Sequence, residues 1–354
     1  MKKLLINPNI TLKLALKKLA QTGKKCLVVL DNKKKLLGTL THGDLRASIL
    51  SGKDLNEKIS KLYNTKPFFF FENNYSNKNA QKIFIEKELD LIPIINKKKE
   101  VKKIIFWSEV FSSSKKTNEF KTNLPVVIMA GGEGKRMEPF TSILPKPLIP
   151  INGKAVIEHI VDKFVEMGIS DFHISVNYKS NLIKAYFDDI KNKNYKIKYL
   201  KEKKPLGTAG SLSLFKKKLN GPIILTNSDI LINADLIDLL NYHSKKKSDI
   251  TLVASVKDYT IPYGVCELHE NGQLLKINEK PTHNFLVNTG LYVINSKVLK
   301  LIPKNKKYDL TDLLKKGKKE KMKICVYPIS DNLWTDVGQW TEYRKATRKF
   351  INQI

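Results

Sequence analysis

The chain has 354 residues, which is enough for two domains that each bury a hydrophobic core. Its formal net charge is +30, a value that often indicates nucleic acid or an anionic membrane as a partner. Only four of the 64 basic residues are arginine, and no stripe of arginine and aromatic residues is present. The composition therefore favours a solvated basic surface over a nucleic-acid site.

The cysteines and the amino-terminal residues point to a cytoplasmic protein. Three cysteines, Cys26, Cys266 and Cys325, are odd in number and far apart, so neither a disulfide framework nor a zinc site is indicated. No apolar run reaches the roughly 18 residues of a membrane span. The first apolar stretch stops at Asn7-Pro8, too early for a signal peptide. We expect no membrane partner.

The first 115 residues contain a weak internal repeat. Apolar residues at helical spacing between 12 and 20 precede a strand at 26–30 and a second strand that ends at Thr41. A second copy has strands at 91–95 and 104–106. This order resembles a tandem of cystathionine-β-synthase-type (CBS) domains, an α+β fold, with copies at about 1–55 and 60–115.

The CBS resemblance implies a nucleotide effector. In that family the Thr and Asp of a G-x-x-T-x-x-D motif hold a ribose, which implies Thr41 and Asp44 here, with an adenine or guanine nucleotide as the ligand. The second copy has Lys103, Phe106 and Glu109 at the corresponding places, so at most one site per chain is expected. The alternative is that Thr41 only caps the following helix.

The residues after the repeat change character twice. A polar segment at 116–123 without periodicity predicts a linker. From 124 onward, strand and helix patterns alternate, which predicts an α/β sheet with helices on both faces. Ligands are expected at the carboxyl ends of its strands. The predicted strands are 172–176, 196–200, 223–227, 250–255 and 287–294, and a helix is predicted at 156–167.

A short apolar strand, 126–130, runs into the glycine-rich turn Gly131–Gly134, which is followed by Arg136 and Lys146. Glycines bring bare backbone N–H groups close to a ligand, and cations nearby favour a polyphosphate. A P-loop is excluded because Met129 stands where its first glycine is needed. The dinucleotide fingerprint is excluded because Met137 replaces its third glycine.

The remaining pattern is Gly-Gly-x-Gly-x-Arg at 131–136, followed by Pro-Lys-Pro at 145–147. It resembles the signature of sugar-1-phosphate nucleotidyltransferases. The resemblance implies a Rossmann-like (GT-A type) nucleotidyltransferase domain over 124–354, preceded by the CBS pair. It also implies the reaction, in which a sugar-1-phosphate oxygen attacks the α-phosphorus of a nucleoside triphosphate and pyrophosphate leaves. Mg²⁺ is the implied cofactor, because both reactants are anions.

The family pattern assigns roles to residues around the glycine turn. Ala130 and the Gly131, Gly132 and Gly134 backbone would cradle the triphosphate. Arg136 would contact the leaving pyrophosphate, and Lys146 would lie against the α-phosphate or the sugar phosphate. The turn Leu206–Gly210 resembles the base-recognition turn, with the nucleotide-binding residues Gly207 and Thr208.

The family pattern also implies the metal and sugar contacts. Asp229 follows an apolar strand, and Asp336 belongs to a W-x-D-x-G motif, so the two carboxylates are the expected Mg²⁺ ligands. The sugar and its phosphate are expected to contact four residues: Gly264, Glu279, Lys280 and Asn288.

The sequence favours a guanylyltransferase. The Leu206–Gly210 turn is typical of mannose-1-phosphate guanylyltransferases, and the domain order resembles bacterial glucosamine-1-phosphate guanylyltransferases of legionaminic acid synthesis, which supply surface or flagellar glycans. We therefore expect GTP and glucosamine-1-phosphate as substrates.

Three alternatives stay open. They are a mannose-1-phosphate guanylyltransferase, another NDP-sugar pyrophosphorylase, and a catalytically silent nucleotide-sensing subunit. The silent subunit is disfavoured because such a protein has no reason to keep all four of the residues Arg136, Lys146, Asp229 and Asp336. An apolar helical stripe at 340–354 leads us to expect a homo-oligomer such as a dimer, with no nucleic-acid partner.

Overall fold

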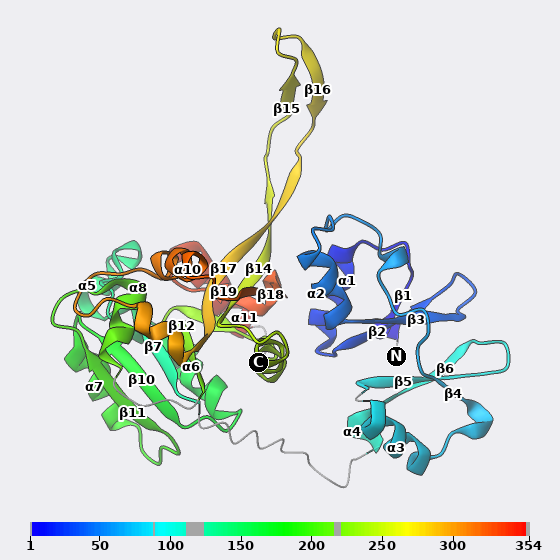
Figure 1. Ribbon diagram of the computed structural model, residues 1–354, viewed down its shortest axis with the longest axis horizontal. Coiled ribbons are helices and arrows are strands. Elements are labelled where there is room, and N and C mark those ends of the chain that lie inside the picture. Colours follow the sequence, from blue (N-terminus) through cyan, green and yellow to red (C-terminus); the bar gives the residue numbers. More distant parts are fainter. Residues whose placement is uncertain (1, 88, 111–123, 216–220, 352–354) are drawn as a thin grey trace. The chain divides into compact units, whose positions relative to one another are not determined.

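The computed structural model describes residues 2–87, 89–110, 124–215 and 221–351 (Figure 1). The chain divides into two compact units, Met1–Asn118 and Glu119–Ile354. The expected linker at 116–123 lies outside the described residues. Within the described ranges, no helix is both long enough and apolar enough to cross a membrane.

The smaller unit contains the same order of elements twice. Each copy has a three-stranded sheet, β1-β2-β3 or β4-β5-β6, in which the first pair is parallel and the second antiparallel. The first copy consists of β1 (Leu5–Ile6), α1 (Leu12–Thr22), β2 (Cys26–Leu30), β3 (Leu36–Thr41) and α2 (His42–Leu50). The second consists of β4 (Phe70–Phe71), α3 (Asn77–Lys87), β5 (Leu91–Ile95), β6 (Val101–Phe106) and α4 (Trp107–Val110).

Local chemistry explains the limits of these elements. Helix α1 begins after Thr11, whose side chain accepts a hydrogen bond from the N–H of Leu14, and it ends at Gly23 in the left-handed conformation. All five residues of β2 and all five of β5 are buried. Continuous apolar runs of this kind are typical of central strands that are covered on both faces.

The larger unit is built on a mixed, mostly parallel sheet with strand order β11-β10-β7-β12-β17-β14-β18. Its strands are β7 (Val126–Met129), β10 (Asp171–Val176), β11 (Lys196–Lys201), β12 (Pro222–Asn227), β14 (Ile250–Thr260), β17 (Thr282–Asn295) and β18 (Ile324–Ser330). Strand β17 runs antiparallel to both of its neighbours. The carboxyl ends of the other six strands therefore lie at one edge of the sheet.

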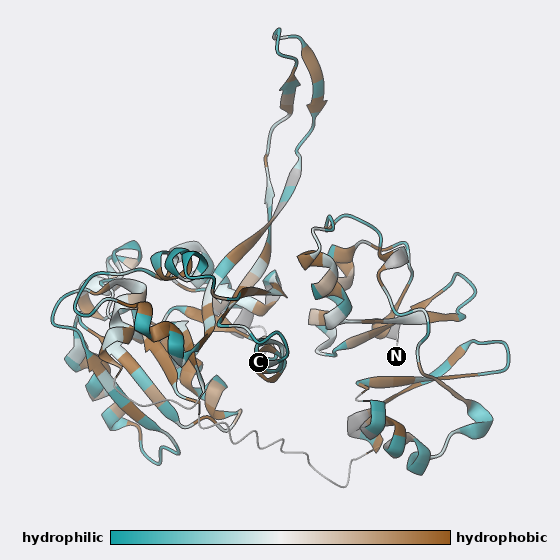
Figure 2. Cartoon of the chain, viewed as in Figure 1, coloured by the Kyte–Doolittle hydropathy of each residue, from teal (hydrophilic) through white to brown (hydrophobic). Residues whose placement is uncertain are grey.

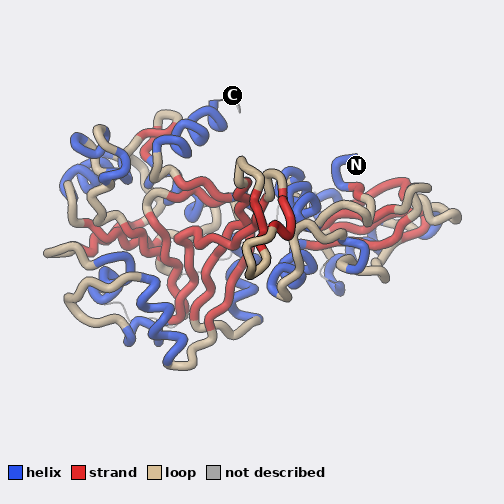
Figure 3. Tube along the Cα trace, turned by 90° about the horizontal axis from the view of Figure 1, so that it is seen from above, coloured by secondary structure: helices blue, strands red, loops and turns tan. Residues whose placement is uncertain are grey.

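Two cores lie on opposite faces of this sheet. Val126 and Ile128 belong to one apolar cluster, and Val127, between them, belongs to the other, as the alternation of side chains along a strand requires. Figure 3 shows helices on both faces, and Figure 2 shows that apolar residues concentrate on the strands between them. The helices are α6 (Val156–Val165), α7 (Ser180–Asp189), α9 (Leu236–Lys245), α10 (Leu310–Lys319) and α11 (Trp340–Ile351).

Several short elements connect this framework. They are α5 (Phe140–Ile143), β8 (Pro150–Ile151), β9 (Lys154–Ala155), α8 (Gly207–Gly210), β13 (Ile230–Ile232) and β19 (Trp334–Asp336). Strands β8 and β9 pair with each other, and so do β13 and β19.

A long ribbon projects from the sheet. Strands β14 and β17 stay paired from Ile250↔Ile294 to Thr260↔Thr282, beyond the edge of the sheet. The ribbon is completed by the hairpin of β15 (Val265–Leu268) and β16 (Leu274–Asn278), which stands away from the rest of the unit in Figure 1. We call residues 258–286 the β arm. The predicted strands at 250–255 and 287–294 are confirmed, but the sequence did not predict their extension into the arm.

Candidate active site

The glycine loop leaves β7 at the carboxyl edge of the sheet and packs closely. The N–H of Ala130, which is buried, donates to the carbonyl oxygen of Ser175 at 2.9 Å. A Cβ atom on Gly131 would lie 2.7 Å from Oε1 of Glu202. Gly134 has a φ of 74°, and a Cβ atom there would lie 2.9 Å from Cβ of Lys146. Gly132 has open space around it, so the loop presents its backbone at this position.

The two predicted metal ligands, far apart in the sequence, come together through a short ladder. Asp229 follows β12, and Asp336 ends β19, which pairs with β13 so that Ile230 is opposite Asp336. The N–H of Val337 donates to the carbonyl oxygen of Asp229 at 2.9 Å. These non-local hydrogen bonds hold the two backbones side by side.

The aspartates and Lys146 converge on Gly338. A Cβ atom on Gly338 would lie 2.7 Å from Oδ2 of Asp229, 2.7 Å from Oδ1 of Asp336, and closer still to Nζ of Lys146. Lys146 donates to Oδ2 of Asp229, and both side chains are largely buried. Only glycine leaves room at position 338 for three charged groups.

The electrostatics of this group couple it to Arg136. Burial raises the pKa of Asp336 above its ordinary value; the N–H of Gly338, which donates to Oδ1 at 2.7 Å, acts in the opposite direction. The Asp229 carboxylate raises the same pKa, whereas Lys146 and Arg136 lower it. The structure therefore brings together two carboxylates and two cations that the sequence placed in one site.

The donor set fits Mg²⁺ better than a closed structural metal site. Within the described residues, no group of three or more His, Cys, Asp and Glu side chains is arranged to hold a metal ion. Asp229 and Asp336 form a pair of hard oxygen donors instead. Mg²⁺ is commonly held by one or two carboxylates together with the phosphate oxygens of a substrate.

The predicted base-recognition turn forms the short helix α8. Gly207 has a φ of 77°, and a Cβ atom on it would lie 2.6 Å from Oδ1 of Asp309. Thr208 donates to the same oxygen from its N–H at 3.0 Å and from its hydroxyl at 3.2 Å. The Thr208 hydroxyl also accepts from the N–H of Leu310 at 2.9 Å. Thr208 thus binds the amino end of α10.

Glu202 is a candidate site residue that the sequence reasoning missed. It follows β11 and is buried, and its Oε1 accepts from the hydroxyl of Ser175. Its Oε2 accepts from the N–H of Leu206 at 2.8 Å. The carboxylate therefore lies between the glycine loop and the 206–210 turn. The available signal was a single acidic residue among three lysines at 201–204, five positions before Gly207.

Of the four predicted sugar contacts, Asn288 lies on β17 beyond the carboxyl end of β12, where its amide donates to the hydroxyl of Tyr292. It is opposite Ala254 on β14, and its Oδ1 accepts from the N–H of Gly290 at 3.1 Å. Gly290 packs against Asn227, the last residue of β12, since a Cβ atom on it would lie 2.6 Å from the Asn227 side chain. This contact places the 288–290 segment at the carboxyl end of β12.

The other three predicted sugar contacts, Gly264, Glu279 and Lys280, lie on the β arm. A Cβ atom on Gly264 would lie 3.0 Å from Oε2 of Glu279, and Oε1 of Glu279 is 4.0 Å from Nζ of Lys280. The Glu279 and Lys280 side chains are both mostly exposed. These residues therefore flank β15 and β16 on the projecting arm, and Figure 1 shows both strands standing away from β19, which ends at Asp336.

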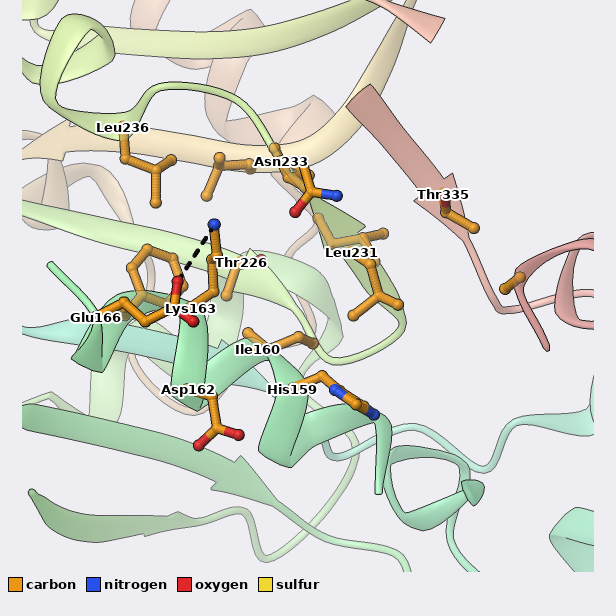
Figure 4. A pocket seen from close by; sticks show the side chains of 15 residues that line it. His159, Ile160, Asp162, Lys163, Glu166, Thr226, Leu231, Asn233, Leu236 and Thr335 are labelled. Carbon is orange, nitrogen blue, oxygen red and sulfur yellow. Dashed lines mark hydrogen bonds and ion pairs between the residues drawn. The ribbon is translucent and has the colours of Figure 1, made fainter. Parts of the chain in front are cut away.

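A cavity of about 270 Å³ lies behind the β13–β19 ladder (Figure 4). It is lined by Leu231 of β13, Thr335 of β19 and residues of α6, including Lys163, whose Nζ is 3.4 Å from Glu166. None of the predicted site residues lines it. Because side chains alternate along a strand, Thr335 and Asp336 point to opposite faces of β19.

In the smaller unit, Thr41 and Asp44 have a local role and also line a cavity. The N–H of Thr41 donates to Oδ2 of Asp44 at 2.8 Å, and the N–H of Asp44 donates to the Thr41 hydroxyl at 3.2 Å, which forms a capping box at α2. The cavity, about 180 Å³, is also lined by Phe68 and Asp90 of the second copy. Burial, with the charges of Asp90 and Asp44, raises the pKa of Cys26 in its wall to about 12.

The site of this α/β protein thus combines a glycine loop, two cations and two converging aspartates at the carboxyl edge of the sheet. The family model described as nucleotidyl transferase matches residues 125–353. The chain therefore belongs to the nucleotidyl transferase family. A CBS domain model matches residues 1–51, so the predicted fold, an α/β nucleotidyltransferase preceded by a CBS domain, is confirmed.

The curated relatives match about two thirds of the chain. The chain is 30% identical over 237 residues to mannose-1-phosphate guanylyltransferase catalytic subunit beta of Dictyostelium discoideum, covering 65% of this chain and 66% of the relative. It is 31% identical over 245 residues to the bifunctional protein GlmU of Methanococcus maripaludis, covering 65% of this chain and 55% of the relative. The chain thus spans about half to two thirds of the length of these relatives.

Solved structures support the same fold. HddC from Yersinia pseudotuberculosis, complexed with GMP-PN, matches with a TM-score of 0.52 at 23% identity, covering 64% of this chain and 99% of that one. A putative glucose-1-phosphate thymidylyltransferase from Bacillus anthracis matches with a TM-score of 0.50 at 21% identity, covering 64% and 94%.

Proposed function

We propose that this chain is a Mg²⁺-dependent sugar-1-phosphate nucleotidyltransferase that transfers GMP from GTP to glucosamine-1-phosphate. The observation that carries the reaction type is the convergence of Lys146, Asp229 and Asp336 around Gly338, beside the glycine loop. Relatives that are mannose-1-phosphate guanylyltransferases and GlmU proteins support the reaction class. The CBS-first domain order supports glucosamine-1-phosphate and a role in legionaminic acid precursor synthesis, and mannose-1-phosphate is the alternative sugar.

The proposed residue roles follow from charge. The sugar-phosphate oxygen forms a bond to the α-phosphorus, the bond from that phosphorus to the bridging oxygen breaks, and pyrophosphate leaves with the electron pair. The backbone of Ala130 and Gly131–Gly134 would hold the triphosphate, with Arg136 on the leaving pyrophosphate. Lys146, which donates a hydrogen bond to Asp229 in this structure, would donate to the reacting phosphate instead. No general base is needed, because a phosphate monoester is already anionic.

Asp229 and Asp336 would hold Mg²⁺, which supplies charge neutralisation at the reacting phosphates when bound. Asn288 would donate to and accept from the sugar in place of its present partners, Tyr292 and Gly290. Gly207 would let the chain approach the base, and Thr208 would hold this turn against α10.

Glu202 supports guanine as the base. Guanine presents two adjacent donors, N1–H and the N2 amino group, on its Watson–Crick edge. Each oxygen of Glu202 accepts one hydrogen bond, from Ser175 or Leu206, and has a second lone pair with which to accept from one of these donors. Adenine, cytosine, uracil and thymine present no such pair of donors. Glu202 lies between the two turns to which the proposal assigns the triphosphate and the base, the glycine loop and the Leu206 turn.

The test measures pyrophosphate release from GTP, ATP, UTP, CTP and dTTP with glucosamine-1-phosphate, mannose-1-phosphate and glucose-1-phosphate. We expect GTP with glucosamine-1-phosphate to give the highest kcat/KM, and Glu202→Gln to lower the preference for GTP over UTP. Glu320→Gln, on the surface of the same unit, is the control. A preference for UTP or dTTP would contradict the guanylyl assignment, and no release with any pair would favour the silent regulatory subunit.

We further propose that the smaller unit is a tandem CBS pair that binds a purine nucleotide. The supporting observation is the cavity that Thr41 and Asp44 line together with residues of the second copy. Calorimetry of the full chain with AMP and ATP, which are not the proposed substrate, should show a binding event that Asp44→Asn weakens. The same variant should keep its pyrophosphate release in the absence of effector. Binding that Asp44→Asn leaves unchanged would restrict Asp44 to its capping role.

A further inference from the structure

The β arm carries a concentration of exposed apolar side chains. Of fifteen large hydrophobic residues exposed in the described part of the chain, eight lie within the 29 residues of the arm. They include Tyr263, Leu268, Leu274 and Ile277, each more than half exposed. Soluble proteins seldom leave so many large apolar side chains uncovered in one segment unless the segment binds a partner.

The arm also lacks the packing that would make it stable alone. Strands β15 and β16 form a two-stranded sheet, and no further strand pairs with either outer edge among the described residues. An isolated two-stranded hairpin is marginally stable in water. Contact with a surface that covers its apolar side chains would therefore stabilise this ribbon most.

The charge of the arm indicates which surface that is. Residues 258–286 contain four carboxylates and two lysines, a net charge of −2, in a chain whose net charge is +30. Two arms packed against each other would bring like charges together, whereas an arm packed against the basic body of the chain pairs opposite charges. A second copy of this chain supplies such a body.

We propose that the β arm of one copy docks on the larger unit of a second copy, and that the second arm reciprocates to give a two-fold dimer. Reciprocal exchange uses one interface twice and closes the assembly. The inference also rests on the proposed function: Gly264, Glu279 and Lys280, which the arm carries away from its own aspartates, complete the sugar-phosphate part of the second copy's site.

The first test is the mass in solution. Sedimentation should give twice the 40.5 kDa of one chain. Leu274→Lys combined with Ile277→Lys should shift the protein toward the monomer, because the change adds positive charge and removes apolar contact. Leu182→Lys, an exposed apolar residue of α7, is the matched control and should leave the mass unchanged. A wild-type monomer, or a mass unaffected by the arm variant, would overturn the proposal.

The second test establishes that the contact is made between chains. Mixed ¹⁴N- and ¹⁵N-labelled protein is cross-linked through amines, and cross-links from Lys276 of the arm to lysines of the larger unit are examined by mass spectrometry. Pairs of mixed label are expected. Pairs of a single label only would show that the arm folds back on its own chain, which overturns the proposal. This result does not depend on catalytic activity.

The third test addresses the shared site. Asp229→Asn and Glu279→Gln chains, each impaired alone, are co-expressed. In the mixed dimer one site receives an intact arm and an intact aspartate, so about a quarter of wild-type activity should return. An inactive wild type would count against the proposed function alone. An active wild type with no recovery in the mixture would count against the exchange of arms.

Discussion

At the scale of residues, Gly338 determines whether the candidate site can assemble. A Cβ atom at this position would meet Lys146, Asp229 and Asp336 together, at distances that non-bonded atoms do not reach. The side chains would have to move apart, and displacements of about 1 Å at reacting groups cost about 10²-fold in rate.

We therefore predict that Gly338→Ala lowers kcat by about 10²-fold and leaves the circular dichroism spectrum unchanged. Gly221→Ala is the control, because a Cβ atom there would make only an ordinary contact of 3.6 Å with Leu124. Steady-state kinetics and far-ultraviolet spectra of both variants are the measurement. Normal turnover of Gly338→Ala would show that the three charged groups do not act together.

The aspartates lead to a prediction that separates activity from stability. Asp229→Asn and Asp336→Asn should each lower kcat by about 10³-fold or more, since an amide is a poor metal ligand. Chelation of Mg²⁺ should abolish the wild-type rate. Asp336→Asn should keep or raise the Tm, because burial already disfavours the charge of Asp336. Near-normal turnover of either variant at limiting Mg²⁺ would exclude that aspartate as a ligand.

At the scale of elements, His243 connects α9 to the sheet. Its Nδ1 is 2.8 Å from the hydroxyl of Thr251, and its Nε2 is 3.3 Å from Oδ1 of Asn295. The Asn295 amide donates to the carbonyl oxygen of Ser248 at 2.7 Å, which fixes Oδ1 as the atom facing the ring. Nε2 therefore donates to Asn295. Burial favours the neutral ring, in which Nδ1 accepts from the hydroxyl of Thr251.

This arrangement predicts a loss of stability in mild acid. Burial lowers the pKa of His243 below its ordinary value, although Asn295 and Asp249 act in the opposite direction. As the pH falls, His243 takes up a proton near pH 6.5 in the unfolded chain and only at a lower pH in the folded chain. The contribution of the neutral His243 to the free energy of unfolding is therefore complete above pH 6.5 and is lost as the pH falls through the lower pKa of the folded state. The Tm of the larger unit should fall between pH 7.5 and 5.5, and His243→Gln should reduce this dependence. His269→Gln, an exposed arm residue, should leave it unchanged.

At the scale of the whole molecule, the two units have separate cores. The apolar cluster around Phe84 and Ile92 lies wholly within the smaller unit, and the clusters around Phe172 and Tyr292 lie wholly within the larger one. Units that share no core unfold independently unless a large interface couples them.

We predict two thermal transitions in calorimetry, one for each unit. GTP with Mg²⁺ should raise only the transition of the larger unit, by a stabilisation of about 2.7 kcal/mol at one hundred times the Kd. AMP or ATP bound at the cavity of the smaller unit should raise only the other transition. Equal shifts of both transitions with GTP would show that the two units are energetically coupled.

Much of the fold could be predicted because local patterns encode local structure. The strands at 26–30 and 91–95 were predicted with the limits that β2 and β5 have, since each is an apolar run between turn residues. The helix predicted at 156–167 ends two residues earlier, at Val165. The glycine loop was found in the same way, because its residues are adjacent in the chain.

Other features depended on contacts between distant segments. The pairing of β13 with β19 unites Asp229 and Asp336, but strands of three residues carry no periodic signal. In the sequence, Glu202 looks like one more charged residue of a solvated turn. In the structure it is buried and accepts hydrogen bonds from Ser175 and Leu206. The length of the β arm was hidden because exposed strands show no alternation of apolar and polar residues.

The sequence alone indicated a repeat followed by an α/β unit, the main strands of that unit with its helix at 156–167, and which residue types stand at the ends of β7 and β12. These properties depend on neighbours within a few turns or strand lengths. Only the tertiary structure shows that Lys146, Asp229 and Asp336 lie together beside Gly338. It also shows that Glu279 and Lys280 belong to the projecting β arm. Such placements are fixed by hydrogen bonds and packing between segments far apart in the sequence, where no local pattern records the contact.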